Sequence, residues 1–349
     1  MKNIYTHLVG PLTVVQAVIE GGCSLAFITS TKAMSLGLIE VSEVNQSGSV
    51  NNLKVKNLAD VPVFFSDGDI LKGAKQNRVL NTSVLLAPKT ETVIPVSCIE
   101  AGRWRHVSAN FCSSNHVASS ALRAVKARAV EVNYKASLTP DYQSDQHAVW
   151  GKIASDHAKL GEVTGTSSMA EVYEKKQPEL DAFLVNLRPL EGATAVCIFF
   201  EGKVLSLDIF ARPEILSEYL PKLVRGALVD SYGKADAKED DGTLEAKALT
   251  LFQLAQQEGS EGKPSVSLGI ETRFSTKEVT GFRLTHEGLV HASLLQLDDS
   301  FKRNSPIPAL LNSLDLADEP RLYDGGFRVD GFYGNNQGGN QGWTRRLGG

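Results

Sequence analysis

Two groups of polar residues flank two apolar runs in the stretch KGAKQNRVLNTSVLLAPKTETVIPVSCIEAGRW, which covers residues 72–104. The first group is KQNR, residues 75–78, and the second comprises Glu100, Arg103 and Trp104. A desolvated arginine can hold a carboxylate or phosphate through its planar fork. Trp104 can stack on a base or another ring, and Glu100 is the one residue of the two groups suited to act as a general base. These residue types fit a site for an anionic ligand that carries a flat ring.

The two runs alternate between polar and apolar residues, which predicts two strands, since side chains of a strand point alternately to opposite faces. A strand over residues 75–86 carries on one face Gln76, Arg78, Leu80, Thr82, Val84 and Leu86, and on the other face Lys75 and Asn77. In the second run, residues 93–100, Glu100 continues an apolar row. Both strands therefore have a core-facing side that ends in a charged residue.

The short connector APKTET predicts that the two strands are antiparallel neighbours. Leu86 then lies near Ile94, and Arg78 lies near Glu100 or Trp104. Two interpretations follow. Either the cluster binds a ligand, or Arg78 and Glu100 form a structural ion pair that closes the open end of a barrel, with Trp104 as a lid on the core.

Length, charge and composition favour a globular protein with more than one domain. At 349 residues, domain-size statistics favour two or three domains. The formal net charge of −4 argues against a general nucleic-acid binder. The four cysteines show no CxxC spacing, so we expect buried thiols in a reducing compartment. The N-terminal residues lack the apolar core of a signal peptide, and no window has the ~18 apolar residues that cross a bilayer. We therefore expect a cytoplasmic protein without a membrane partner.

The periodicity of the apolar residues changes along the chain from strand-like to helical and back, which predicts an α+β protein. Residues 1–112 contain short runs rich in Val, Ile and Phe, typical of an antiparallel β sandwich or barrel. Residues 113–190 have helical spacing and are predicted to form a helical connector. Residues 191–297 are predicted to pack helices on a small antiparallel sheet. Residues 298–349 form a tail rich in Gly and aromatic residues, which we expect to be flexible or docked on the body or on a sister subunit.

Helical spacing after Asn110 predicts a long helix with a basic face. Its start is expected near residue 113, where the residues able to cap it are Ser113, Ser114 and Asn115. The residues expected on a solvated face are Arg123, Lys126 and Arg128.

Proline and glycine give further local predictions. Pro178 is expected to kink or divide a later helix, whereas Pro213 is expected in the first turn of another. Two-residue hairpin turns are expected at Glu201–Gly202 and at Glu287–Gly288.

Other candidates for chemistry are weaker. Asp208 lies on the strand that enters the Pro213 helix and can point to solvent, cap the helix or project into a cleft, and capping or turn support is the commonest of these roles. His291 is a second minor candidate, and Cys112 with His116 is a third, at a spacing that is common by chance. The sequence has no HExxH, CxxC or Asp-rich calcium loop, so we predict no dedicated metal site. It also has no GxGxxG or GxxxxGK[ST] motif, and it identifies no cofactor.

The polar stretch resembles the signature of a bacterial and archaeal family, the ARG and rhodanese-phosphatase-superfamily-associated protein domain. The residues that match its first block are Gly73, Lys75, Gln76, Asn77, Arg78 and Asn81. Those that match its second block are Ile94, Pro95, Val96, Ser97, Cys98, Glu100, Arg103 and Trp104. Weaker matches are Gly192, Gly202, Asp208, Phe210, Gly281, Leu284 and His291. The resemblance covers about residues 8–297 and leaves the Gly-rich tail unaccounted for.

The resemblance implies a link to the metabolism of NAD and ADP-ribose, mainly through neighbouring genes, and it supplies no settled reaction. The leading hypothesis is a protein that binds or processes an NAD-derived nucleotide such as ADP-ribose. Lys75 and Arg78 would neutralise phosphates, Glu100 would be the base if hydrolysis occurs, and Trp104 would stack. The alternative is a structural or assembly protein, in which the cluster is a latch and the tail of residues 298–349 forms a homo-oligomer.

Overall fold

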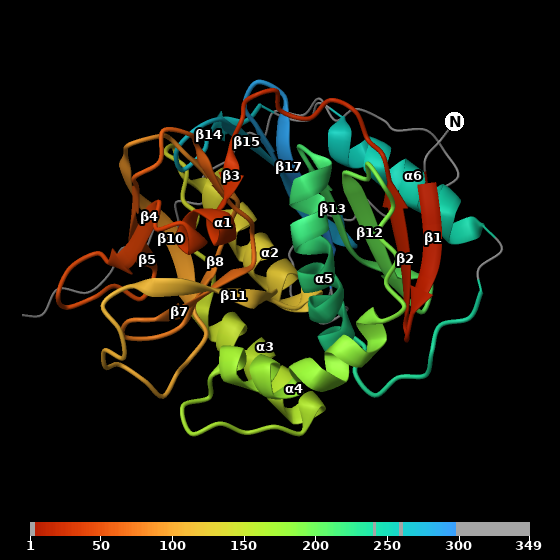
Figure 1. Cartoon of the computed structure of the whole chain (residues 1–349), viewed down its shortest axis with the longest axis horizontal. Helices are drawn as coiled ribbons and strands as arrows, with labels where there is room; N and C mark the ends of the chain where they lie inside the picture. The colour runs from red at the N-terminus through yellow and green to blue at the C-terminus, as the bar shows by residue number, and fades with distance from the viewer. Residues whose placement is uncertain (1–3, 240–241, 258–260, 298–349) are drawn as a thin grey trace, which may run out of the picture. The chain divides into compact units, whose positions relative to one another are not determined.

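The computed structural model describes residues 4–239, 242–257 and 261–297, which belong to one compact unit (Figure 1). These residues form six helices and seventeen strands, and the strands pair antiparallel except for one short parallel pair. The predicted α+β class is confirmed.

The largest sheet has eight antiparallel strands and brings together both ends of the described chain. Its strands, in spatial order, are β1 (Ile4–Val9), β2 (Leu12–Ala17), β12 (Ala195–Phe200), β13 (Lys203–Phe210), β17 (Leu289–Gln296), β16 (Val279–Thr285), β15 (Ile270–Ser275) and β14 (Lys263–Pro264). Val14 of β2 lies opposite Ile198 of β12. β2 therefore pairs with the segment predicted as a C-terminal part, with β1 at the edge, and the sheet contains strands from both sides of residue 112.

The remaining strands, β3 to β11, lie in the chain between β2 and β12 and form two smaller sheets. The six-stranded sheet consists, in order, of β11 (Phe111–Val117), β7 (Asp69–Gly73), β8 (Arg78–Leu80), β10 (Glu91–Cys98), β5 (Asn52–Asn57) and β4 (Ile39–Glu43). The three-stranded sheet consists of β3 (Ile28–Thr29), β6 (Val63–Phe65) and β9 (Val84–Leu86). As a statement about domains, the division into residues 1–112, 113–190 and 191–297 stays a prediction, and the tail 298–349 lies outside the described residues.

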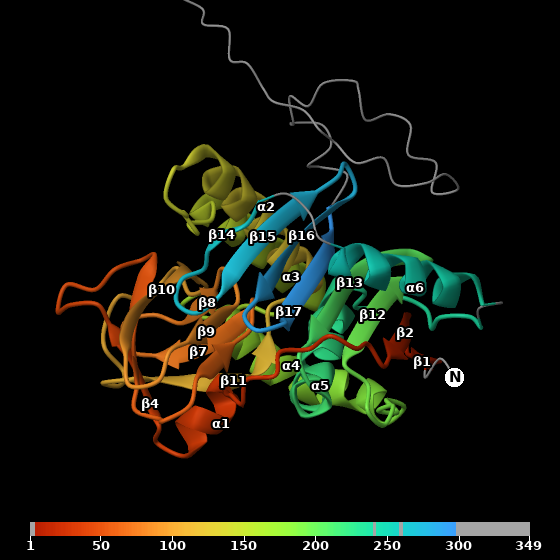
Figure 2. The same ribbon diagram turned by 90° about the horizontal axis from the view of Figure 1, so that it is seen from above.

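Helices cover both faces of the eight-stranded sheet, because its central strands are apolar on both faces. The helices are α1 (Ser30–Ser35), α2 (Ser120–Ala136), α3 (Gln146–Leu160), α4 (Met169–Leu184), α5 (Pro213–Asp230) and α6 (Thr243–Gln256). Val196 and Ile198 pack in one cluster with α5, whereas Ala195 and Cys197 pack in another with α6. Figure 2 shows β12 and β13 between these two helices.

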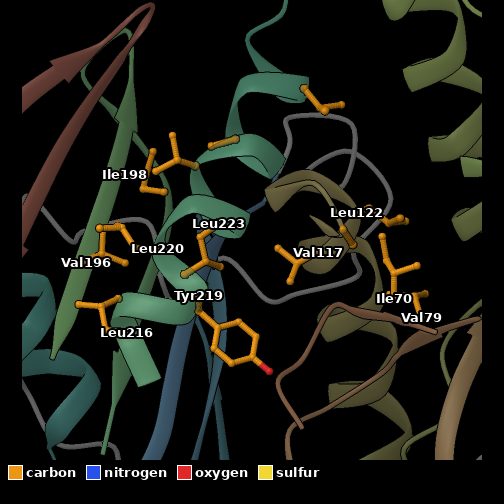
Figure 3. Packing of buried hydrophobic residues seen from close by; sticks show 14 of the residues in the cluster. Ile70, Val79, Val117, Leu122, Val196, Ile198, Leu216, Tyr219, Leu220 and Leu223 are labelled. Carbon is orange, nitrogen blue, oxygen red and sulfur yellow. The ribbon is translucent and has the colours of Figure 1, made fainter. Parts of the chain in front are cut away.

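The cluster beside α5 also includes residues of the six-stranded sheet. Figure 3 shows Leu220 of α5, Leu122 of α2 and Ile70 of β7 as parts of the same buried cluster. Tyr219 of α5 is fully buried there and stacks on Phe210 with ring centroids 5.3 Å apart. One continuous core therefore joins the large sheet, the central helices and the sheet that carries the polar signature.

Turn chemistry agrees in part with the local predictions. Glu201 and Gly202 both have positive φ, 48° and 75°, as a type I′ hairpin requires. Glu287 and Gly288 also have positive φ, 52° and 114°, but the second hairpin is not the expected two-residue turn: three residues, 286–288, join β16 to β17, and the register shifts beside them. Pro213 is the first residue of α5, where its missing N–H would have no helical partner.

One helix prediction was wrong. Residues 111–117 form strand β11, and the helix begins only at Ser120, with Ser119 accepting a hydrogen bond from the Leu122 amide. The polar side chains that resembled a cap belong to a strand that alternates between buried and exposed positions. Of the two outcomes expected for Pro178, division does not occur, since α4 runs unbroken from Met169 to Leu184, whereas a kink stays a prediction.

The single strand predicted over residues 75–86 is in fact two short strands in different sheets. β8 pairs with β10, whereas β9 pairs with β6. Leu86 is therefore paired with Val63 and not with Ile94, although Leu86 and Ile94 share one core cluster, and Arg78 lies opposite Cys98. The turn at residues 81–83 redirects the chain, and a period-2 pattern cannot report such a change of sheet.

Candidate functional site

The signature lies at the tight turn between β7 and β8 and at the loop that follows β10. Gly73 has φ of 128°, and Ala74 also has a positive φ of 38°. A Cβ on Gly73 would come within 2.5 Å of the Ser108 hydroxyl, so only glycine fits this approach. Arg103 donates to the Ala74 carbonyl at 2.7 Å and thereby holds the turn against the loop.

Glu100 and Arg103 form a buried bidentate pair. Arg103 donates through Nε to Oε1 at 2.8 Å and through Nη2 to Oε2 at 2.6 Å. The Thr166 hydroxyl and the backbone N–H of Asn77 donate to the same carboxylate at 2.8 and 3.1 Å. Burial opposes ionisation, but the hydrogen bonds from Arg103, Thr166 and Asn77 outweigh it and lower the pKa of Glu100. A carboxylate held in this way is a weak proton acceptor and a strong anchor.

The two amides of the signature belong to the same closed network. Gln76 donates to the Glu100 carbonyl at 2.9 Å and accepts from Arg78 at 3.0 Å. Asn77 accepts from the Gly73 amide and from Arg103, and it donates to Ser168. With these bonds made, Gln76, Asn77, Glu100 and Arg103 position the loops and keep little capacity for a ligand.

Arg78 differs from these residues because its guanidinium forms no salt bridge among the described residues, although Glu43 and Glu100 are near enough to favour its charge. The side chain is 0% exposed and donates to the Gln76 side chain and to the carbonyls of Asn77 and Ser49. Among the residues that the structure describes, its Nε has no hydrogen-bond partner and the guanidinium forms no salt bridge. The predicted Arg78–Glu100 ion pair is not formed, since Glu100 pairs with Arg103. Burial lowers the pKa of Arg78.

Lys75 and Trp104 lie beside Arg78 at the surface. The Trp104 ring centroid is 5.3 Å from Lys75 Nζ and 5.6 Å from Arg78 Cζ. Lys75 is held by the carbonyls of Gln46 and Ser47 at 2.6 and 2.8 Å. Trp104 itself is 47% exposed. Together, Lys75, Arg78 and Trp104 form what we call the cation–tryptophan cluster, and it is the part of the signature with unused binding capacity.

A second polar centre, unpredicted from the sequence, lies deep in the core around Arg123. Its Nη atoms contact the two carboxylate oxygens of Asp208 at 3.0 and 2.6 Å, and its Nε contacts Asp67 at 3.1 Å. Lys126 binds Asp67 at 2.9 Å and also the Leu80 carbonyl. These four charged residues are between 0% and 1% exposed, so the predicted solvated face of α2 was wrong for Arg123 and Lys126. We call them the buried charge centre.

His291 extends this centre through a hydrogen-bonded row. Its Nε2 lies 3.2 Å from Asp208 Oδ1 and its Nδ1 lies 2.8 Å from the Ser83 hydroxyl. Burial opposes the charge of Asp208, but Arg123 and His291 outweigh it and hold the pKa of Asp208 well below its usual range. Asp208 therefore neither caps a helix nor faces solvent. The order Ser–His–Asp resembles a hydrolytic triad, but all three side chains are buried, and Asp208 already pairs with Arg123.

The remaining candidates do not gather at either centre. Cys112 is exposed and donates to the Lys72 carbonyl at 3.5 Å, whereas His116 is buried and contacts Gln177. Within residues 4–239, 242–257 and 261–297, no three His, Cys, Asp or Glu residues gather in a way that could hold a metal ion. No helix in the same residues is long and apolar enough to cross a membrane.

Two cavities lie away from the signature. One, of about 450 Å³, is lined by residues of the β16–β17 turn and by Gly269 and Ile270. The other, of about 430 Å³, lies between the start of α5 and the segment of residues 189–193. The candidate site at the signature is therefore argued from its side chains and not from a deep pocket.

The sheet order and the hydrogen-bonded signature residues define an α+β protein. Its buried Glu100–Arg103 pair joins the β7–β8 turn to the loop after β10. In a comparison with protein families, residues 5–295 match the ARG and Rhodanese-Phosphatase-superfamily-associated Protein domain. This match covers most of the chain, so the chain belongs to that family, as its resemblance predicted. No curated protein and no solved structure gives a significant match.

Proposed function

We propose that the cation–tryptophan cluster binds an NAD-derived nucleotide such as ADP-ribose. The observation that carries this proposal is the state of Arg78, a fully buried guanidinium that forms no salt bridge among the described residues and whose Nε has no hydrogen-bond partner there. A buried charge is costly unless it is paired, and an anion is the natural complement of the arginine fork. A phosphate group at this position would supply the missing charge.

The neighbours of Arg78 favour a nucleotide over a simple anion. Lys75 adds a second positive charge, and its ammonium has one donor left after the carbonyls of Gln46 and Ser47. Trp104 exposes about half of its surface beside both cations and can stack on a base, a contact worth ~1–3 kcal/mol. Phosphate and base can thus be held by adjacent side chains.

In this proposal Gln76, Asn77, Glu100 and Arg103 position the cluster, and no bond-breaking step is assigned. The lowered pKa of Glu100 argues against the role of general base that its residue type first indicated. Its carboxylate already accepts four hydrogen bonds, which leaves it poorly placed to take a proton from a water.

A thermal-shift panel with NAD, nicotinamide mononucleotide, ADP-ribose and AMP tests the proposal. A ligand at 100 times its dissociation constant stabilises the native state by about 2.7 kcal/mol, a shift of several degrees. Trp104→Ala should remove the shift. Val107→Ala is the matched control, because Val107 is an exposed apolar residue of the same loop. A flat panel, or an equal loss in both variants, would count against the proposal.

The alternative of a structural or assembly protein is supported by one feature, the closed network of Glu100 and Arg103. That network latches the β7–β8 turn to the loop after β10 and to Thr166 before α4. In this alternative, residues 298–349 would mediate assembly. They lie outside the described residues, so assembly through them is a proposal that truncation of the chain after Asp298 would test.

A further inference from the structure

We propose that the loop between β4 and β5, residues 44–51, is a lid over the cation–tryptophan cluster, and that a diphosphate group of the ligand displaces it. This inference rests on the proposed function, and it adds the phosphate chemistry and the route of entry for the same site. The Arg78 side chain is 0% exposed, so an anion can reach its guanidinium only if a neighbouring segment moves. The β4–β5 loop is a surface segment in direct contact with that guanidinium.

Three backbone carbonyls of the loop bind both cations of the cluster. Ser49 accepts from Arg78 Nη2 at 3.3 Å, which is longer than the ~2.9 Å typical of an N–H···O bond. Lys75 Nζ donates to the carbonyls of Gln46 and Ser47 at 2.6 and 2.8 Å. A phosphate oxygen is a stronger acceptor for these cations than a neutral carbonyl, because a hydrogen bond between two charged groups is the stronger kind. The loop carbonyls therefore hold donors that an anionic ligand would bind more strongly.

The arrangement of the two cations favours a diphosphate over a single phosphate. Lys75 Nζ and Arg78 Cζ lie 5.3 and 5.6 Å from the centroid of the same Trp104 ring. One short loop segment binds both of them, through residues 46 and 47 on Lys75 and through residue 49 on Arg78. Two linked phosphates can replace both sets of carbonyls at once, whereas one phosphate replaces only one set and leaves the other in place.

The loop is fixed at its two ends. Glu43, the last residue of β4, accepts from the Lys75 backbone amide at 3.3 Å. Asn51, just before β5, accepts from the Val96 backbone amide at 2.9 Å. Residues 45–47 between these ends are exposed. The middle of the loop can therefore move outward while β4 and β5 stay in their sheet.

Gly48 sets the closed position of the loop. Its φ is 78°, a conformation that residues with a side chain rarely adopt. A Cβ at this position would come within 3.2 Å of Lys75 and of Trp104, which is closer than an ordinary contact. The backbone can thus lie against the cluster only because residue 48 has no side chain.

Hydrogen exchange of the full-length wild-type chain, followed by mass spectrometry, tests whether the loop moves. The Gly48 amide is protected in the closed loop by the Asn45 carbonyl and side chain. With saturating ADP-ribose or inorganic pyrophosphate, peptides covering residues 44–51 should exchange about 2- to 10-fold faster, the effect of losing one net hydrogen bond. Orthophosphate at the same concentration should leave the exchange close to that of the free protein.

Gly48→Ala tests the cost of closing the loop. The substitution strains the closed conformation, so it should tighten the binding of ADP-ribose about 5- to 30-fold in isothermal titration. Gly37→Ala is the matched control, because Gly37 lies before β4 with a similar φ of 65°, and an added Cβ there would meet no described atom within 4 Å. It should leave the affinity unchanged.

Each outcome separates the lid from the proposed function. Slower exchange of residues 44–51 on binding, or weaker binding by Gly48→Ala alone, would show that the loop is a wall of the bound site and would overturn the lid. An equal effect of orthophosphate would overturn the choice of a diphosphate. Binding of ADP-ribose with unchanged loop exchange refutes the lid and leaves the proposed function standing. Displacement by pyrophosphate without any nucleotide binding does the reverse, and no binding of either probe refutes both.

Discussion

Replacing Asp208 by Asn tests the account of the buried charge centre. The substitution keeps the size and a hydrogen-bond acceptor for His291, but it removes the carboxylate that Arg123 contacts at 2.6 and 3.0 Å. Breaking a buried ion pair from one side costs about 3–5 kcal/mol, since a charge is left buried and uncompensated. Asp67 still contacts Arg123 at 3.1 Å, so we expect the lower end, about 3 kcal/mol.

This loss should appear as a melting temperature about 6–9 °C below that of wild type at neutral pH, at ~2–3 °C per kcal/mol for a chain of this size. Thermal unfolding followed by circular dichroism measures it. Asp60→Asn is the matched control, because Asp60 is 91% exposed in its pair with Lys89 and should change little.

The pH dependence of the same difference follows from the lowered pKa of Asp208. A carboxylate whose folded-state pKa lies below its unfolded value, ~3.9, stabilises the protein above that value. The stabilisation is lost as the pH falls through the folded-state pKa. The gap between wild type and Asp208→Asn should therefore be constant from pH 7 to about 5 and shrink below about pH 4. A gap below ~2 °C at pH 7, or one that widens in acid, would refute this account of Asp208.

Two further predictions concern the signature and the tail. Glu100→Gln leaves Arg103 buried without its counter-charge, so we expect a loss of about 3–5 kcal/mol of stability. The nucleotide affinity of the folded variant, measured by titration, should stay within about tenfold (~1.4 kcal/mol) of wild type. A larger loss of affinity with unchanged stability would instead place Glu100 in contact with the ligand. Truncation after Asp298 should leave a monomer unchanged in light scattering if the protein is a nucleotide binder, whereas loss of an oligomer would favour the assembly alternative.

The local chemistry of the chain was predictable where short-range physics decides it. The turns at Glu201–Gly202 and Glu287–Gly288 need positive φ at two residues, a demand that involves no distant contact. Pro213 begins a helix for an equally local reason. The polar signature was also visible, because charged residues that continue an apolar row are unusual wherever the strand lies. The family resemblance was read from the same stretch and from the segments around β13 and β17, and the family match itself covers residues 5–295.

Which arginine of the signature pairs with Glu100 was not predictable, because the pairing depends on which side chains the tertiary structure brings together. Arg78 and Arg103 are residues of one type, each at the polar end of an apolar run. In the structure Arg103 pairs with Glu100, whereas Arg78 forms no salt bridge among the described residues. The choice was made by the break at residues 81–83, which sends β9 to another sheet and sets Arg78 opposite Cys98.

By itself, then, the sequence determined the α+β class, the positions of the hairpin turns, the start of α5 and the location of the polar signature, all of which follow from local periodicity and backbone chemistry. The tertiary structure decided the pairing of β2 with β12 and the burial of Arg123 and Lys126. A basic helix face is solvated unless acids from elsewhere cover it, and here Asp67 and Asp208 come from segments far away in the chain. Burial of a charge depends on that encounter, which no local pattern records.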